Sequence, residues 1–76
     1  MSGLSEEVLA LSVPYLGPAA KKFLERQTRS HMDGLGFDQL QKGHLHELGK
    51  WIEVSAGLLI EKAKAKELAD RIRALA

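Results

Sequence analysis

The chain has 76 residues, with eleven Lys and Arg against ten Asp and Glu, and it contains no cysteine. This length fits one helical domain over residues 1–76, and the lack of cysteine excludes disulfides and thiolate metal sites. A formal net charge of +1 is far below the basic excess of a dedicated nucleic-acid-binding protein. No apolar stretch approaches the ~20 residues of a bilayer span, and the first residues lack a signal-peptide pattern. We therefore expect a cytoplasmic protein with no membrane partner.

The amino-acid usage favours helix. Ala, Leu, Glu, Lys and Arg are frequent, while β-branched and aromatic residues are few. No segment shows the strict alternation of apolar and polar residues that is typical of a half-buried strand. The sequence therefore predicts an all-α fold, a compact bundle of four to five short helices.

A proline and a Gly-Pro pair set the limits of the first two predicted helices. The first begins near Ser5, a capping residue followed by acids, and should end at Pro14 because the residue before a proline avoids the helical conformation. The second begins with Pro18 at its first position and closes at Asp33-Gly34. Its apolar stripe consists of Leu16, Ala19, Ala20, Phe23, Leu24, Gln27 and His31.

The second half of the chain predicts an irregular segment and two further helices. Leu35–Gly43 is broken by glycines but holds apolar residues that need burial, so we expect a short helix or an ordered loop packed on the core. The two helices are expected to span His44–Ala56 and Glu61–Leu75. The residues expected to face inward on the first are Leu45, Leu48, Ile52, Ser55 and Ala56. Those on the second are Ala65, Leu68, Ala69, Ile72 and Leu75. Between them, Leu58, Leu59 and Ile60 are too apolar for a free loop, and we expect this turn to be packed.

No pattern in the sequence indicates catalysis or metal binding. His44 and His46 are two residues apart, so on a helix they point in nearly opposite directions and cannot bind one ion together. Gly34-Leu35-Gly36 lacks the rest of a phosphate-binding fingerprint. We therefore expect no enzyme activity, with no catalytic or metal-binding residues, no cofactor and no small-molecule substrate.

Two surface features are candidates for binding. One is an apolar groove for a partner helix, bordered by Tyr15, Phe37, Leu40 and Trp51. The other is the basic face of the second predicted helix, formed by Lys21, Lys22, Arg26 and Arg29. Each has an ordinary alternative, because a lone tryptophan is commonly a core residue and a cationic helix face is commonly solvated and paired with nearby acids.

One segment resembles a known class of domain. Leu16–Ala20 (LGPAA), followed by Phe23–Gln27 (FLERQ), is similar to a segment of small helical domains attached to bacterial signalling proteins. That resemblance implies a bacterial interaction or regulatory domain and brings no catalytic motif. The layout of several short helices is also similar, in architecture alone, to that of SAM and death-fold interaction domains.

These observations favour a non-enzymatic protein–protein interaction or regulatory module. The expected partner is another protein or a second copy of the chain, which would give a homo-oligomer. The alternative is a small helical domain that binds nucleic acid through a basic helix face.

Overall fold

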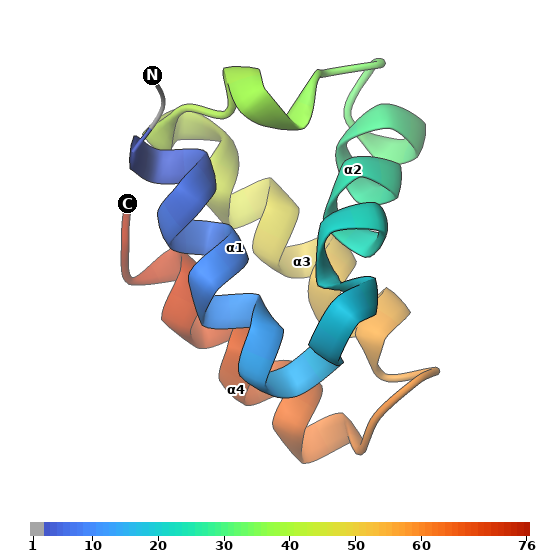
Figure 1. Cartoon of the computed structure of the whole chain (residues 1–76). Coiled ribbons are helices and arrows are strands. Elements are labelled where there is room, and N and C mark those ends of the chain that lie inside the picture. The colour runs from blue at the N-terminus through green and yellow to red at the C-terminus, as the bar shows by residue number, and fades with distance from the viewer. Residues whose placement is uncertain (1–2) are drawn as a thin grey trace.

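The computed structural model describes residues 3–76, which fold into four α-helices and three short 3-10 turns without a β-strand (Figure 1). The helices are α1 (Gly3–Leu16), α2 (Ala20–His31), α3 (Leu45–Ala56) and α4 (Lys62–Arg73), and the 3-10 turns are Gly17–Ala19, Phe37–Gln39 and Lys42–His44. The predicted all-helical bundle is confirmed. The upper end of the predicted number of helices is too high for residues 3–76, because the segment between α2 and α3 contains only two 3-10 turns.

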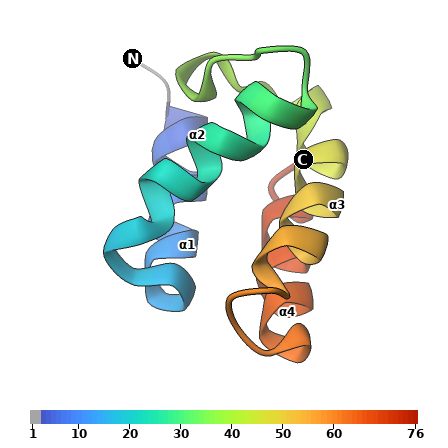
Figure 2. The ribbon, with the colours of Figure 1, turned by 90° about the vertical axis from the view of Figure 1, so that its right-hand side faces the viewer.

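The packing of α3 against α4 is the most extensive contact between elements (Figures 1 and 2). Gly49 leaves room for the Arg73 side chain at this contact, because a Cβ atom at this position would lie 2.9 Å from Cγ of Arg73. Arg73 crosses above Gly49 and pairs with Glu53 on α3, at 3.2 Å between Nη2 and Oε1. α1 packs on α2 and α4, and α2 packs on α3, which closes the bundle.

α1 continues two residues beyond Pro14, so the predicted end of this helix was wrong. A proline in the last turn removes one hydrogen bond, to the carbonyl of Ala10, and its fixed φ is compatible with a helix. Packing of Tyr15 and Leu16 against the core offsets that loss. The helix ends instead at Gly17, whose φ of +63° lies in the left-handed region. Pro18 then lies in the 3-10 turn that precedes α2.

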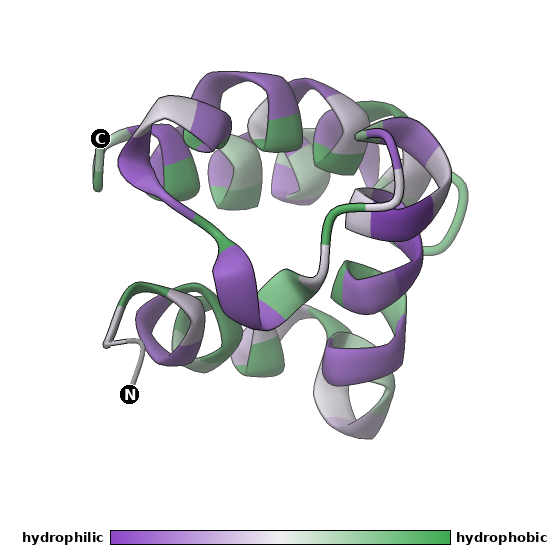
Figure 3. Cartoon of the chain, turned by 90° about the horizontal axis from the view of Figure 1, so that it is seen from above, coloured by the Kyte–Doolittle hydropathy of each residue, from purple (hydrophilic) through white to green (hydrophobic). Residues whose placement is uncertain are grey.

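The core is formed by the inward faces of all four helices. Figure 3 shows hydrophobic stretches of the ribbons turned toward the interior and hydrophilic stretches turned outward. The largest fully buried apolar side chains are Val8, Leu24, Leu45, Leu48, Ile52, Leu68 and Ile72. The predicted inner stripes of α3 and α4 are confirmed except at Ser55 and Leu75, which are half-buried.

Hydrogen bonds from buried and half-buried polar side chains link elements that are distant in the sequence. The hydroxyl of Ser5 on α1 donates a hydrogen bond of 2.6 Å to the carbonyl of Phe37. The hydroxyl of Ser55 on α3 donates to Oε1 of Gln27 on α2, at 2.9 Å. These bonds fix the loop between α2 and α3 to α1, and α2 to α3. Within residues 3–76, no helix is long and apolar enough to cross a bilayer.

Candidate functional site

The turn between α3 and α4, residues 57–61, exposes two leucines to solvent. Leu58 is 86% exposed and Leu59 is 66% exposed, and Val54 near the end of α3 is 60% exposed. The prediction that this turn is packed was therefore wrong for both leucines. Only Ile60 packs against the core, where it is half-buried. We refer to Val54, Leu58 and Leu59 as the apolar tip.

Backbone hydrogen bonds hold the turn in one conformation. The amides of Leu58 and Leu59 donate to the carbonyls of Ser55 and Ala56, at 3.2 and 2.9 Å, and the amide of Ile60 donates to the same Ala56 carbonyl at 2.8 Å. Leu58 and Leu59 face solvent in this turn, whereas Ile60 packs on the core. The leucines are therefore presented by an ordered turn.

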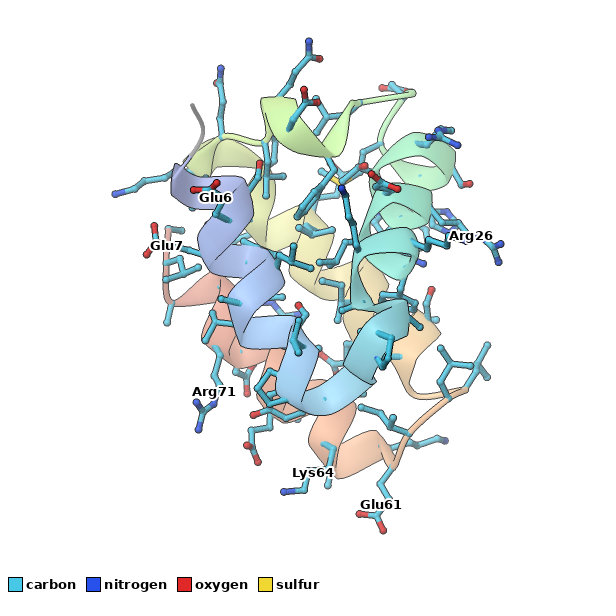
Figure 4. The ribbon with its side chains drawn as sticks, viewed as in Figure 1. Glu6, Glu7, Arg26, Glu61, Lys64 and Arg71 are labelled. Atoms are coloured by element: carbon cyan, nitrogen blue, oxygen red, sulfur yellow. The ribbon has the colours of Figure 1, made fainter. Side chains whose placement is uncertain are left out.

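A shallow hollow lies on each side of the apolar tip. The hollow on the α4 side has a volume of about 550 Å³ and is lined by Glu53, Val54, Gly57, Leu58, Lys62, Ala63 and Lys66. The hollow on the α2 side has a volume of about 190 Å³ and is lined by Ala19, Lys22, Phe23, Arg26 and Leu59. Arg26 projects outward from α2 on this side of the molecule (Figure 4). Cationic side chains thus flank the tip on two sides.

The cations beside the tip differ in how far their charge is already compensated. Lys66 bonds Asp70 at 2.9 Å, and this hydrogen bond raises the pKa of Lys66 and lowers the pKa of Asp70. No ion pair within residues 3–76 joins Lys22, Arg26 or Lys62 to a carboxylate. These three side chains therefore present uncompensated positive charge at the rim of the tip.

The predicted basic face of α2 divides into two parts. All four of its cations are exposed, but Lys22 and Arg26 lie one helical turn apart beside Leu59. Lys21 and Arg29 line a separate hollow that also contains the acids Glu25 and Asp38. Only the first pair adjoins the apolar tip.

The four residues of the predicted partner groove do not line one groove. Phe37 and Leu40 are buried in the core, because the loop between α2 and α3 folds over the helices and uses them to seal one end of the bundle. Tyr15 lines a hollow between α1 and α4. Trp51 is half-buried on α3, where its ring stacks on His31 at 4.1 Å between ring centroids.

The three histidines lie in separate structural settings. His31 covers one face of Trp51, whose buried indole Nε1 has no hydrogen-bond partner within residues 3–76, so stacking and packing hold this side chain. Nδ1 of His44 accepts a bond of 3.0 Å from the amide of Gln41, before α3. His46 is exposed. In the part of the chain that the structure describes, no group of three His, Cys, Asp or Glu side chains could hold a metal ion.

A further hollow of about 560 Å³ lies between α1 and α4. Its walls and rim are formed by Ala10, Leu11, Pro14, Tyr15, Ile60, Glu61, Lys64, Glu67 and Arg71, three of which are labelled in Figure 4. The hydroxyl of Tyr15 donates a hydrogen bond of 2.5 Å to Oε2 of Glu67. This bond raises the pKa of Tyr15 and lowers the pKa of Glu67. The same carboxylate lies within ion-pair distance of Lys64 and Arg71.

Replacing Tyr15 by Phe should lower the thermal midpoint near neutral pH by a small amount, because the hydrogen bond to Glu67 is lost. Because folding lowers the pKa of Glu67, its ionised carboxylate stabilises the fold at pH values above the ordinary glutamate pKa of about 4.3. This stabilisation is lost as the pH falls through the lowered pKa. Because folding raises the pKa of Tyr15, its protonated hydroxyl stabilises the fold at pH values below the ordinary tyrosine pKa of about 10. This stabilisation is lost as the pH rises through the raised pKa. The difference between Tyr15→Phe and the parent should therefore shrink as the pH falls through the lowered pKa of Glu67, measured by thermal unfolding followed by circular dichroism. A difference that stays constant between neutral and acidic pH would contradict this assignment.

Comparison of the chain with protein-family models, curated proteins and solved structures found no match. The apolar tip was not predicted as a binding surface, although Leu58 and Leu59 are unusually apolar for a turn. The signal that could have found the tip is a run of three large apolar residues in a connection too short to bury them all.

Proposed function

We propose that the chain is a non-enzymatic protein-interaction module whose contact surface is the apolar tip. The single observation that carries this proposal is the exposure of Leu58 and Leu59 on a turn that backbone hydrogen bonds hold in place. A contiguous apolar patch on a small domain is typical of an interaction surface, whereas scattered single residues are not. The ordered turn also reduces the entropy lost on binding.

The size of the tip is suited to a transient contact. Complete burial of one leucine side chain contributes about 1.5–3 kcal/mol, so Leu58 and Leu59 together can contribute about 3–6 kcal/mol before the costs of association. Stable complexes usually bury much larger surfaces. A weak, reversible contact of this kind is consistent with a regulatory role.

The double variant Leu58→Ser/Leu59→Ser tests the proposal. The tagged full chain should recover a partner from a lysate of cells that express it, or should show a concentration-dependent mass by light scattering, and the double variant should lose that association. Val13→Ser is the matched control, because Val13 is an exposed apolar residue on α1, outside the tip, at 47% exposure. Both variants should keep the circular dichroism spectrum and unfolding midpoint of the parent, because they change exposed side chains.

Two results would contradict the proposal. One is an association that survives in the double variant as well as in Val13→Ser, which would place the contact elsewhere on the molecule. The other is a strictly monomeric chain that recovers no partner. The circular dichroism comparison distinguishes both results from simple misfolding.

Nucleic-acid binding is a second candidate, favoured by one observation. The cations of the α2 basic face are all exposed, and none of them is ion-paired within residues 3–76: Lys21, Lys22, Arg26 and Arg29. A gel-shift assay over a range of salt concentrations tests this candidate, because phosphate contacts weaken steeply with salt. If the double variant Lys22→Glu/Arg26→Glu binds as well as the parent, the part of this face formed by Lys22 and Arg26 is not the site.

A further inference from the structure

The charges around the apolar tip are unevenly distributed. On the α2 side, Lys22 and Arg26 line the hollow that contains Leu59, and that hollow has no acidic lining residue among those described. On the α4 side, Lys62 and Lys66 line the hollow that contains Leu58. The one acid of that hollow, Glu53, is already paired with Arg73. A ligand that covers the leucines therefore meets positive charge on both flanks.

This distribution disfavours a second copy of the chain in a symmetric contact. A two-fold contact places the same patch on both subunits, so Lys22, Arg26 and Lys62 of one copy would face the same cations of the other. Like charges brought together at an interface are unfavourable. The complementary surface must instead carry carboxylates beside its apolar groups.

The shape of the site favours a protein segment over a lipid surface. The hollow beside Leu58 has an apolar wall formed by Val54 and Ala63, which a protein side chain can cover. The side chains of a polypeptide can enter both hollows. An apolar stripe bordered by acids on each side matches the tip and its two cationic flanks, and an amphipathic helix supplies that pattern.

We infer that the partner of this site is an acidic amphipathic helix, whose apolar stripe covers Leu58 and Leu59 and whose carboxylates face Lys22 and Arg26 on one flank and Lys62 on the other. This inference rests on the proposed function, because it names the chemistry of the partner that the apolar tip binds. The apolar contact supplies most of the affinity, and the cations select for acidic partners and orient them.

Two synthetic helical peptides test the inference. They share one length and one leucine stripe, and they differ only in carrying Glu or Lys at the flanking positions. Binding to the full chain is followed by the amide chemical shifts of residues 57–62 in ¹⁵N-labelled protein. The Glu peptide should bind at least about tenfold more tightly than the Lys peptide at low salt, and this advantage should shrink as salt screens the charges.

Two double variants with the same change in net charge show which cations are responsible for the preference for the Glu peptide. Lys22→Glu/Arg26→Glu should weaken binding of the Glu peptide by about tenfold, because it reverses the charge of the flank beside Leu59. Lys21→Glu/Arg29→Glu makes the same change in net charge on the adjacent row of α2, beside the separate hollow, and at about 0.15 M salt it should weaken binding of the Glu peptide clearly less. Leu58→Ser/Leu59→Ser should remove binding of both peptides.

The remaining outcomes separate this inference from the proposed function. Equal binding of the Glu and Lys peptides, lost in the leucine variant, overturns the acidic partner but leaves the tip as a contact surface. Peptide binding that survives in the leucine variant overturns both. The inference is also overturned if neither peptide binds. It fails as well if vesicles of phosphatidylcholine and phosphatidylserine shift the tip resonances while the Glu peptide does not, or if the tip mediates dimerisation of the chain.

Discussion

Replacing Ile52 by Ala should lower the free energy of unfolding by about 3–4 kcal/mol. Ile52 is fully buried on α3, which packs extensively against α4. Truncation removes three carbon atoms from the core and leaves a cavity that the neighbouring helices can only partly fill. Because the buried leucines of α3 and α4 lie in the same cluster, the loss extends to contacts on both helices.

The loss is large relative to the stability of so small a domain. At about 0.05–0.15 kcal/mol per residue, the whole chain is expected to be stable by about 4–11 kcal/mol. Urea unfolding followed by circular dichroism should therefore show a much lower midpoint with a similar slope. Val54→Ala is the matched control, because Val54 is exposed on the same helix and its truncation should change the stability by less than about 0.5 kcal/mol. Equal losses in the two variants would contradict the assignment of Ile52 to the core.

The helices that pack most closely are also the ones that the sequence predicts best. Apolar residues at three- and four-residue spacing place Leu48 and Ile52 on one face of α3, and Leu68 and Ile72 on one face of α4. Burial of those faces dominates the energetics, so local details hardly affect the outcome. The predicted limits of both helices are accordingly within two residues of the observed ones.

Sequence rules for where a helix ends were less reliable where packing of the neighbouring residues opposed them. The effect of Pro14 on the preceding residue predicted the end of the first helix, yet α1 continues to Leu16 because the residues after the proline pack on the core. The positive φ of Gly17 determines the end of the helix, and a sequence pattern does not show which of several nearby glycines and prolines has that role. Single-residue preferences of about 1–3 kcal/mol are small enough for packing to override.

The binding surface was predicted poorly for a different reason. The rule that apolar residues are buried holds for most of the core, and its extension to Leu58 and Leu59 assumed that the turn could reach the interior. In the structure, only Ile60 of these three residues packs on the core. Phe37 and Leu40 were expected both to need burial, in a segment packed on the core, and to border a partner groove; the loop buries them in the core.

Replacing Phe37 by Ala should therefore lower the free energy of unfolding by about 3 kcal/mol, at the low end of the range for buried aromatic residues because the site lies near the surface. Phe37 packs in the same buried cluster as Leu24 and Leu45, and its carbonyl accepts the buried hydrogen bond from Ser5. Truncation should loosen the 3-10 turn and weaken its attachment to α1. A Phe37 that bordered an open groove would instead leave the stability almost unchanged when truncated.

Gln39→Ala provides the comparison within the same 3-10 turn, because Gln39 is exposed and its truncation should change the stability by less than about 0.5 kcal/mol. Amide hydrogen exchange gives a second measurement of the same effect. In Phe37→Ala, protection should fall first at the amides of Gln39 and Leu40, which donate to the carbonyls of Gly36 and Phe37. Protection in the centre of α3 should fall only as far as the global stability does. Unchanged protection in this turn together with unchanged stability would mean that the loop between α2 and α3 is not fixed to the core by Phe37.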